Sequence, residues 1–522
     1  MAAAREWETR GNRTGRQSEL HRSLNIFRFA GYALARAGRP DRAVEVLELG
    51  RARELSQWVS GELVDLERLE HIDPRLVAEF RELRDAVSAA ENAELSGSPV
   101  SASEAAPAVE RFRAVVDEIR RLPSFSNFLA SASWAEIGEA IDAQEALVYI
   151  ASAPYGSLAI VVWRSEGELE VEVIEARKLT SSDLMRSFLS ADGRAGYFRA
   201  QAEGEDMNPA LEEFGASLGA QLLAPLATKL REIGVARLCM VPTGLLGLLP
   251  LHALACNAVE ARCLLDDFSV VFAPSALVRA VCRKRRDSGQ PVRRSLIIGD
   301  PQPSVQPLTG AAFEISMIAQ LMAGHQVEVL SGTDATRDRV LEHLPGADHV
   351  HFACHGAASF FDEALGAALY LSDDEPLTAR DVLALRGFHP RLVVASACET
   401  GVIQSYAAAD ESLTLGTVFL ASGAVAVIST LWAIDDYATS LLMNRLYELL
   451  ADEADPVDAL REAQLWLRDL SQREEEAYLA ERPRLLSHCR KLAKSSRRSS
   501  GSRELRPYSD AYYWAPFVLA GA

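Results

Sequence analysis

The stretch "VVASACETG", residues 393–401, combines the end of a strand with a potentially reactive side chain. Its valines predict a buried strand, and small residues follow where that strand should end. Cys398 comes next, followed by an acid, a hydroxyl residue and a glycine. A cysteine at such a place is most often a small buried hydrophobe. Its role therefore depends on which other groups the fold brings to the same place.

The chain around this stretch alternates between short Val/Ile-rich runs and helical segments. The runs are SLIIG (295–299), VEVL (327–330), HVHFA (349–353), LVVASA (392–397), AVAVIST (424–430) and WAPFVLAG (514–521). Such alternation predicts an α/β fold with a mainly parallel sheet and helices on both of its faces. In these sheets the functional groups gather beyond the carboxyl ends of the strands. Cys398 is expected at that edge.

His355 ends another of these strands, in "HVHFACHGA", residues 349–357. Neighbouring parallel strands would bring it to the same edge as Cys398. A free thiol with a pKa of about 8.5 is mostly protonated at neutral pH, and a nearby imidazole favours the thiolate and then protonates the leaving amine. The backbone N–H groups of Gly356 and Cys398 would hold the developing oxyanion. Two packed core residues are the alternative.

A zinc site is a rival interpretation, because His349, His351, Cys354 and His355 are crowded together. Residues 349 and 351 share one face of a strand while 354 faces away, and the spacing matches no common structural zinc site. Strand alternation turns Cys354 inward, which favours packing over chemistry. No metal and no cofactor are expected.

Composition narrows the class of protein. A chain of 522 residues suggests about three units, and 48% hydrophobic residues suffice for sizeable cores. A net charge of −19 argues against nucleic acid as a direct ligand. No signal-peptide core opens the sequence and the seven cysteines are scattered, so a cytoplasmic location is expected. Residues 412–434 contain no charged residue and are long enough to span a membrane, but Gly423 divides them, so a buried helix followed by a central strand is predicted instead.

The first part of the chain has a helical pattern. Residues 32–59 resemble a tetratricopeptide-type helical hairpin in a single convincing copy, so a truncated repeat array and an ordinary hairpin both stay open. Residues 145–176 predict a meander of short strands. Residues 237–255 predict a strand and a loop, and the basic stretch 283–294 is interpreted as a linker.

Five motifs occur in the order and approximate spacing of the CHAT domain, a caspase- and separase-related peptidase domain often found beside tetratricopeptide repeats. They are "HFACHG" (351–356), "SACETG" (396–401), "LTLGTVFLASGAVAVISTLWAIDDYAT" (413–439), "ALREAQLWLR" (459–468) and "YYWAPFVLAG" (512–521). The resemblance implies a cysteine endopeptidase that cleaves protein substrates, with His355 and Cys398 as the catalytic dyad. It also implies bacterial defence or programmed death as the setting.

The same resemblance implies three regions. Residues 1–135 would be helical and tetratricopeptide-like, 136–290 a degenerate caspase-like half, and 291–522 the catalytic caspase-like half. An activator protein or complex would act through the helical N-terminus. The alternative is a catalytically silent, protease-like scaffold for protein–protein interaction, although intact motifs around both dyad residues argue against it.

The segment "STLWAIDD", residues 429–436, follows the strand after the one that delivers Cys398. It is placed to wall the pocket for the residue before the scissile bond, with Trp432 as an apolar wall and Asp435 and Asp436 as negative charges. The resemblance favours Asp436, and hence a basic residue before the scissile bond, with a large apolar one against Trp432 as the alternative. An Asp here is equally able to cap the helix that begins near Tyr437.

An insertion follows the motif at 459–468. It contains a long charged helix and a segment, residues 491–503, that is rich in Ser, Lys and Arg. Such a composition predicts a flexible, solvated segment, and contact with a partner or with nucleic acid is the less favoured alternative.

Overall fold

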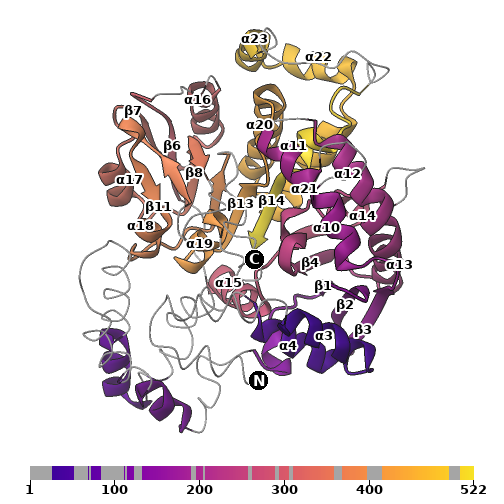
Figure 1. The fold of residues 1–522 in the computed structure, drawn as a ribbon. Coiled ribbons are helices and arrows are strands. Elements are labelled where there is room, and N and C mark those ends of the chain that lie inside the picture. Colours follow the sequence, from indigo (N-terminus) through magenta and orange to yellow (C-terminus); the bar gives the residue numbers. More distant parts are fainter. Residues whose placement is uncertain are drawn as a thin grey trace.

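The protein is built around one sheet of eleven strands, in the order β3-β2-β1-β4-β5-β14-β13-β12-β8-β6-β7 (Figure 1). The computed structural model describes residues 26–51, 69, 72–83, 111, 114–122, 132–189, 196–203, 206–256, 262–288, 293–304, 308, 310–357, 367–396, 414–492 and 506–522. A second sheet, of three short strands, has the order β11-β10-β9.

The C-terminal half of the sheet is parallel, as the alternating pattern predicts. Its strands are β6 (Arg294–Pro301), β7 (Gln326–Gly332), β8 (His349–Ala353), β12 (Leu392–Ala395) and β13 (Ala426–Thr430). The helices between and after them are α16 (Ala311–Leu321), α17 (Arg337–His343), α18 (Ala379–Leu383), α19 (Leu415–Ala421), α20 (Asp436–Ala451) and α21 (Pro456–Asp469). Every residue of β8, β12 and β13 is buried, which explains why apolar residues do not simply alternate with exposed polar ones along these strands.

The middle half begins with the predicted meander, in which β1 (Glu145–Ala153), β2 (Gly156–Ser165) and β3 (Glu168–Ala176) are antiparallel neighbours. β4 (Arg237–Pro242) and β5 (Ser269–Phe272) then run parallel to β1. The helices of this half are α9 (Trp134–Glu139), α10 (Ser181–Leu189), α11 (Tyr197–Glu203), α12 (Asn208–Phe214), α13 (Ala224–Glu232), α14 (Leu264–Asp267) and α15 (Ala276–Ser288). A π-helical turn (Gly215–Leu223) joins α12 to α13, and a 3-10 turn (Gly244–Leu248) follows β4.

β14 (Phe517–Gly521) joins the two halves into one sheet and lies at its centre in Figure 1. It is antiparallel to β13, with Thr430 opposite Phe517, and parallel to β5 through the pair Ala520 and Phe272. The strands β1, β4 and β5 therefore run opposite to the strands β6, β8, β12 and β13. As a result, the carboxyl ends of the two sets of strands lie at opposite edges of the sheet.

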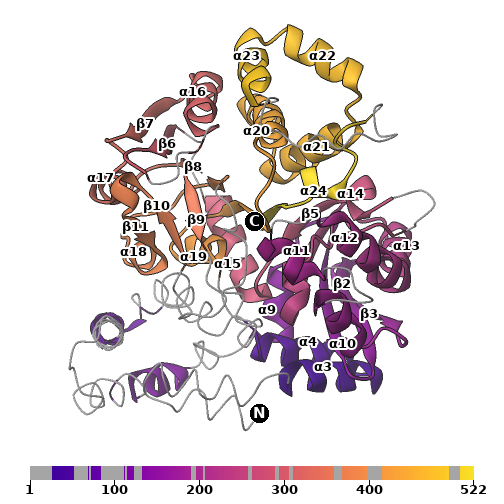
Figure 2. The same cartoon turned by 45° about the horizontal axis from the view of Figure 1, so that its top comes forward.

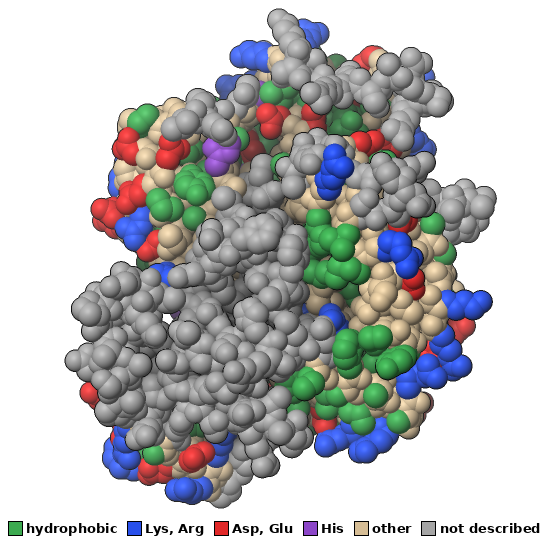
Figure 3. Space-filling model, in the orientation of Figure 1, with side chains coloured by type: hydrophobic (Ala, Val, Ile, Leu, Met, Phe, Trp, Pro, Cys, Tyr) green, Lys and Arg blue, Asp and Glu red, His purple; other side chains and the backbone are tan. Residues whose placement is uncertain are grey.

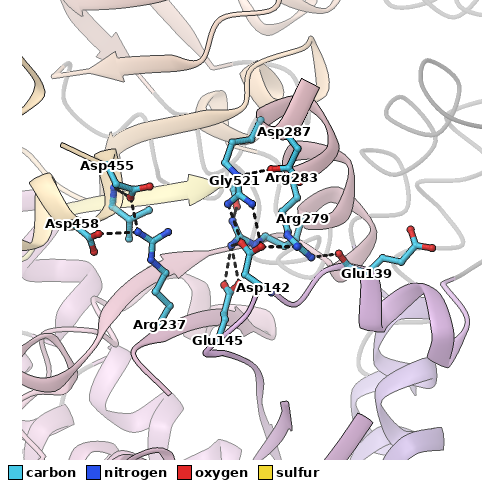
Figure 4. A network of polar contacts seen from close by, with 12 residues as sticks. Glu139, Asp142, Glu145, Arg237, Arg279, Arg283, Asp287, Asp455, Asp458 and Gly521 are labelled. Atoms are coloured by element: carbon cyan, nitrogen blue, oxygen red, sulfur yellow. Dashed lines mark hydrogen bonds and ion pairs between the residues drawn. The ribbon is translucent and has the colours of Figure 1, made fainter. Parts of the chain in front are cut away.

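The junction of the two halves at β14, called the seam below, is stabilised by a buried charge network (Figure 4). The guanidinium of Arg279, on α15, is 1% exposed and donates to both carboxylate oxygens of the fully buried Glu145, at 2.8 and 3.1 Å. A second arm of the same guanidinium donates to the backbone oxygen of Gly521 in β14. One side chain thus ties β1, α15 and the seam strand.

The predicted linker over residues 283–294 is wrong in its first half, because α15 continues to Ser288. The basic side chains that suggest a solvated linker are bound to the protein instead. Arg286 donates to Asp142 Oδ2 at 2.9 Å, and Arg285 donates to the backbone oxygen of Leu420 at 2.6 Å. A run of arginines is compatible with a helix where carboxylates and helix-terminal carbonyls receive them.

The uncharged segment 412–434 contributes α19 and β13, both buried in the C-terminal half, as the position of Gly423 predicts. Gly423 has a φ of +130°, and a Cβ there would lie 1.8 Å from the backbone oxygen of Phe388, so only glycine fits the turn between them. Among the described residues, no helix has the length and apolarity needed to cross a membrane.

The N-terminal region forms a helical hairpin of α3 (Ile26–Arg36) and α4 (Pro40–Leu49). Its buried face, including Tyr32, Val44 and Leu47, belongs to the same core as the middle half. The residues that would show further repeats lie largely outside the described part of the chain. The tetratricopeptide-like interpretation and the three region boundaries therefore stay predictions.

The insertion contains two helices rather than one long helix, α22 (Gln472–Ala480) and α23 (Pro483–Leu492). The break precedes Pro483, whose ring is compatible with the first turn of a helix and not with its interior. The α22–α23 hairpin stands beside α20 and near α16, as both cartoon views show (Figures 1 and 2). Residues 493–505, which include most of the predicted flexible segment, lie outside the described residues.

Candidate active site

His355 lies just beyond the carboxyl end of β8, close to where the sequence predicts it. Cys354 separates it from Ala353, the last residue of the strand. The chain then enters β9 (His355–Ala357), which pairs antiparallel with β10 (Ala368–Tyr370), and β10 pairs with β11 (Pro376–Thr378). His355 is half-buried and lies opposite Tyr370, and Gly356 lies opposite Leu369. The imidazole therefore stands at the carboxyl edge of the C-terminal half.

The neighbouring strand β12 ends at the same edge. Ser396 follows it and donates through its backbone N–H to the oxygen of Phe352 in β8, at 3.0 Å, and through its hydroxyl to the same oxygen, at 3.1 Å. Cys398 belongs to residues 397–413, outside the described residues. Its pairing with His355, and its share in an oxyanion hole with Gly356, stay predictions.

A cavity of about 50 Å³ opens beside these strand ends. Its lining comes from the carboxyl ends of β8, β12 and β13, and from helices α16 and α20. The lining residues are Leu308, Gly310, Ala311, Glu314, Ala353, Cys354, Ser396, Thr430, Trp432, Ile434, Asp436, Thr439 and Ser440. Two of them are carboxylates, and none of these thirteen described residues is basic. The cavity thus presents negative charge without a resident cation.

The three predicted pocket residues have different roles. Trp432 is buried, lines the cavity and donates from its indole Nε1 to the backbone oxygen of Tyr512, at 3.2 Å. Asp435 caps α20, since its Oδ1 accepts from the N–H groups of Tyr437 and Ala438 at 3.0 and 3.1 Å. Asp436 lines the cavity from the solvent side. Asp435 therefore makes the capping contacts that the alternative interpretation expects of an Asp here, and the pocket role of Asp436 stays a prediction.

The pKa of Asp436 is raised above that of an ordinary aspartic acid. Partial burial in the cavity wall is the largest cause, and the carboxylates of Asp435 and Glu314 add to the rise. The imidazole of His355 acts in the opposite direction, which shows that it lies within electrostatic reach of Asp436. A cation entering the cavity would remove the repulsion that disfavours the ionised carboxylate.

Behind the cavity lies a buried polar chain. Tyr447 OH, on α20, is 2.8 Å from His351 Nδ1 and 3.2 Å from His349 Nε2. His351 Nε2 lies 3.2 Å from Glu314 Oε1, but the geometry is not that of a hydrogen bond, and within the described residues this oxygen has no hydrogen-bond partner. Burial lowers the pKa of His349 to about 3 and raises that of Tyr447, so both are neutral at physiological pH.

These contacts also bear on the zinc alternative. His349 and His351 face Tyr447 on one side of β8, whereas Cys354 is buried with Val350 and Phe352 on the other. Among the described residues, no group of three or more His, Cys, Asp or Glu side chains is arranged to hold a metal ion.

Sequence reasoning missed Glu314. It lies in the first turn of α16, "AAFEISMIAQL", where it is the only charged residue of an otherwise mostly apolar helix. A lone acid there is a signal, because α16 directly follows β6 and so begins at the edge where the strands end. Its side chain is 12% exposed.

Comparison with known protein families finds a match for the C-terminal half of the molecule and part of the middle half. The family model of the CHAT domain matches residues 212–522. The chain belongs to the CHAT domain family. The match covers β4 and β5 of the middle half and all of the C-terminal half, including His355, the cavity and the motif around Cys398.

Two solved structures are similar to this CHAT protein at 9% identity. One is the Saccharomyces cerevisiae separase–securin complex, with a TM-score of 0.42, covering 98% of this chain and 37% of that chain. The other is the Arg-specific cysteine proteinase gingipain R, with a TM-score of 0.33, covering 65% and 72%. The chain thus spans little more than a third of the separase chain. No curated protein matches the sequence.

Proposed function

We propose that this CHAT protein is a cysteine endopeptidase in which Cys398 is the nucleophile and His355 the general base and acid. The observation that carries the proposal is the position of His355, at the carboxyl end of β8 and beside a cavity whose wall includes the end of β12. The chain passes from there to Cys398 in two residues. The CHAT domain is related to peptidases, and this relation supports peptide-bond hydrolysis as the reaction at this place.

In the proposed reaction the imidazole of His355 removes the thiol proton of Cys398. The thiolate attacks the scissile carbonyl carbon, and backbone N–H groups of Gly356 and Cys398 stabilise the oxyanion. The imidazolium gives its proton to the leaving amine, and an acyl-enzyme thioester remains. Water, deprotonated by the same imidazole, hydrolyses the thioester and regenerates the thiol.

Specificity for a basic residue before the scissile bond is the second part of the proposal. Asp436 lies at the mouth of the cavity, within electrostatic reach of His355. An acidic side chain of the substrate would meet an unpaired like charge there, whereas Lys or Arg would be attracted. Trp432 supplies a flat wall for the aliphatic part of such a side chain.

Regulation through the N-terminal hairpin is the third part. Ile26 and Phe29 of α3 are 50% and 36% exposed, so this helix retains apolar surface for an activator protein. On the face drawn in Figure 3, basic and acidic side chains of the described residues are interspersed rather than gathered in one basic surface. A protein partner therefore suits the hairpin better than a nucleic acid.

A cysteine-reactive peptide probe and fluorogenic peptides test the proposal together. We expect labelling at Cys398 and cleavage after Arg or Lys. Both His355→Ala and Cys398→Ala should reduce cleavage by on the order of 10³-fold or more, and the double variant should be little worse than either single one. The half-buried thiol of Cys256 provides the control variant Cys256→Ser. Independent, additive losses of cleavage in the two variants, or no labelling of Cys398 in the presence of binding partners, would favour the scaffold alternative.

A further inference from the structure

The α22–α23 hairpin contacts both helices that carry the cavity carboxylates. On α20, the hydroxyl of Tyr437 donates to the buried Glu475, and Glu448 accepts from Arg482 Nε at 2.7 Å. On α16, Gln320 accepts from Arg484 at 2.9 Å. Glu314 is on α16 and Asp436 begins α20. The hairpin therefore spans the two helices, and its contact with Gln320 lies at the end of α16 that is away from Glu314.

One side chain of the hairpin touches both helices next to the cavity. The imidazole of His488, which is 7% exposed, stacks on the ring of Phe313 with centroids 4.1 Å apart and planes 9° apart. Phe313 directly precedes Glu314. His488 Nε2 also lies 3.3 Å from the hydroxyl of Ser440, which itself lines the cavity.

The hydrogen bonds continue from Ser440 to Asp436. The Ser440 hydroxyl donates to the backbone oxygen of Asp436 at 2.8 Å. Since a hydroxyl has one proton to donate, Nε2 of His488 must carry the proton in its contact with Ser440. Burial and the charge of Lys491 lower the pKa of His488, and Glu314 opposes this. A neutral imidazole with its proton on Nε2 fits these contacts.

We propose that His488 is a positioning residue that fixes α16 against α20 beside the cavity, and so sets where Glu314 and Asp436 stand in the wall that a guanidinium or ammonium group of the substrate would meet. Glu314, inside the cavity, would then be a second specificity-determining residue beside Asp436, at the mouth. This inference rests on the proposed peptidase for its substrate. Its physical basis is that two carboxylates line one cavity whose described lining contains no basic side chain, so both gain a charge-assisted contact from an entering cation.

Variants of His488 test the inference through the split between KM and kcat. With a peptide that has Arg before the scissile bond, His488→Ala and Ser440→Ala should raise KM about tenfold and leave kcat nearly unchanged, because binding of the side chain is weakened equally in the ground and transition states. His488→Gln retains a donor toward Ser440 and should recover part of the loss. Arg484→Ala is the matched control, since it removes a contact of the same helix at the exposed end of α16.

A binding measurement separates this inference from the proposed peptidase. Benzamidine, a planar amidinium, is titrated calorimetrically into the full chain carrying Cys398→Ala. Binding that weakens about tenfold with His488→Ala and with Glu314→Gln, but not with Arg484→Ala, supports the inference even if no peptide is cleaved, in which case only the peptidase fails. Unchanged affinity in both variants overturns it. Cleavage by the wild type without benzamidine binding leaves the peptidase standing and overturns the cation pocket.

Discussion

The two carboxyl edges of the sheet each contain a carboxylate, and the two carboxylates differ in their hydrogen-bond partners. In the middle half, α3 and α4 lie against the ends of β1 and β5, and the buried Glu48 accepts from Tyr149 OH at 2.7 Å and from the backbone N–H of Ala276 at 2.9 Å. In the C-terminal half the edge opens into a cavity, where Glu314 Oε1 has no hydrogen-bond partner among the described residues. Glu48 thus has donors built into the fold, whereas Glu314 Oε1 has beside it an imidazole nitrogen at 3.2 Å that does not make a hydrogen bond with it.

The physical causes of the pKa shifts follow the same division. Burial raises the pKa of Glu48, but the N–H of Ala276 and the hydroxyl of Tyr149 oppose the rise. Partial burial raises the pKa of Asp436, and its carboxylate neighbours add to the rise. Hydrogen bonds thus oppose the rise at Glu48, whereas no hydrogen bond is among the causes that act on Asp436.

The largest expected effect on the free energy of unfolding is at the seam, where β14 joins the two halves of the sheet. Arg279→Ala leaves the carboxylate of Glu145 buried without its cation, and should lower the free energy of unfolding by about 3–5 kcal/mol. Urea denaturation measures it. Arg237→Ala is the control, because Arg237 pairs with Asp455 and Asp458 at a more exposed place (Figure 4), where a loss of about 0–1 kcal/mol is expected. Equal losses would mean that the seam is not held by the buried pair.

The second effect concerns the closed edge. Glu48→Ala leaves Tyr149 OH and the N–H of Ala276 without their acceptor, and should cost about 1.5–3 kcal/mol. Hydrogen exchange should show faster exchange in β1 and at the start of α15 than in β8. Uniform acceleration across both halves would show that the hairpin stabilises the whole sheet rather than one edge.

One buried histidine in each half allows a test by acid. Burial lowers the pKa of His252, in the middle half, and of His349, in the C-terminal half, to about 3 from an ordinary 6.5. Below pH 6.5 each of these histidines is protonated in the unfolded chain but stays neutral in the folded protein. Their contribution to the free energy of unfolding is therefore full above pH 6.5 and falls as the pH decreases toward 3.

Replacing either histidine with leucine should therefore make stability less dependent on pH between 6.5 and 3, by about 1.4 kcal/mol per pH unit. Unfolding free energies at several pH values measure the slope. An unchanged slope in one variant would show that its histidine is protonated in the folded state, and the two halves would then differ in solvent access.

The smallest effect on stability is expected at the open edge. Because the pKa of Asp436 is raised, the folded protein holds that proton more tightly than the unfolded chain does, and stability falls as the pH rises through the folded pKa. Asp436→Asn should thus unfold at the same or a slightly higher temperature at pH 7, while the preference for a basic residue before the scissile bond falls at least tenfold. A lower melting temperature with an unchanged preference would make Asp436 a structural residue, like Glu48.

Much of the fold is visible in local sequence patterns. Buried parallel strands appear as continuous apolar runs, which is why β6, β8, β12 and β13 are found almost residue by residue. The position of His355 follows from its place after such a run. The division of 412–434 into helix and strand follows from Gly423, whose backbone conformation only glycine adopts easily.

The rest depends on contacts between distant residues. No local pattern shows that β14 lies between β13 and β5, or that the arginines of α15 meet Asp142 and thereby extend a helix through an apparent linker. Asp435 and Asp436 are chemically identical neighbours, and only the direction of the backbone at the start of α20 decides which one caps the helix. Glu314 reaches the cavity from 41 positions before His355.

The seam strand also sets the order of events during synthesis. β5 ends at Phe272 and its partner β14 begins at Phe517, 245 positions later. At roughly 5–20 residues per second, the ribosome needs roughly 12–50 s to make the intervening chain. During that interval β5 has an unpaired edge, and β13 has one from its own synthesis at Thr430 until β14 is made. Unpaired edges are the feature that makes nascent sheets prone to aggregate. Tyr512, whose backbone oxygen holds the cavity wall at Trp432, emerges just as late. The wall of the cavity is therefore complete only after nearly all of the described residues have been made, and any activity that depends on this cavity has to wait until then.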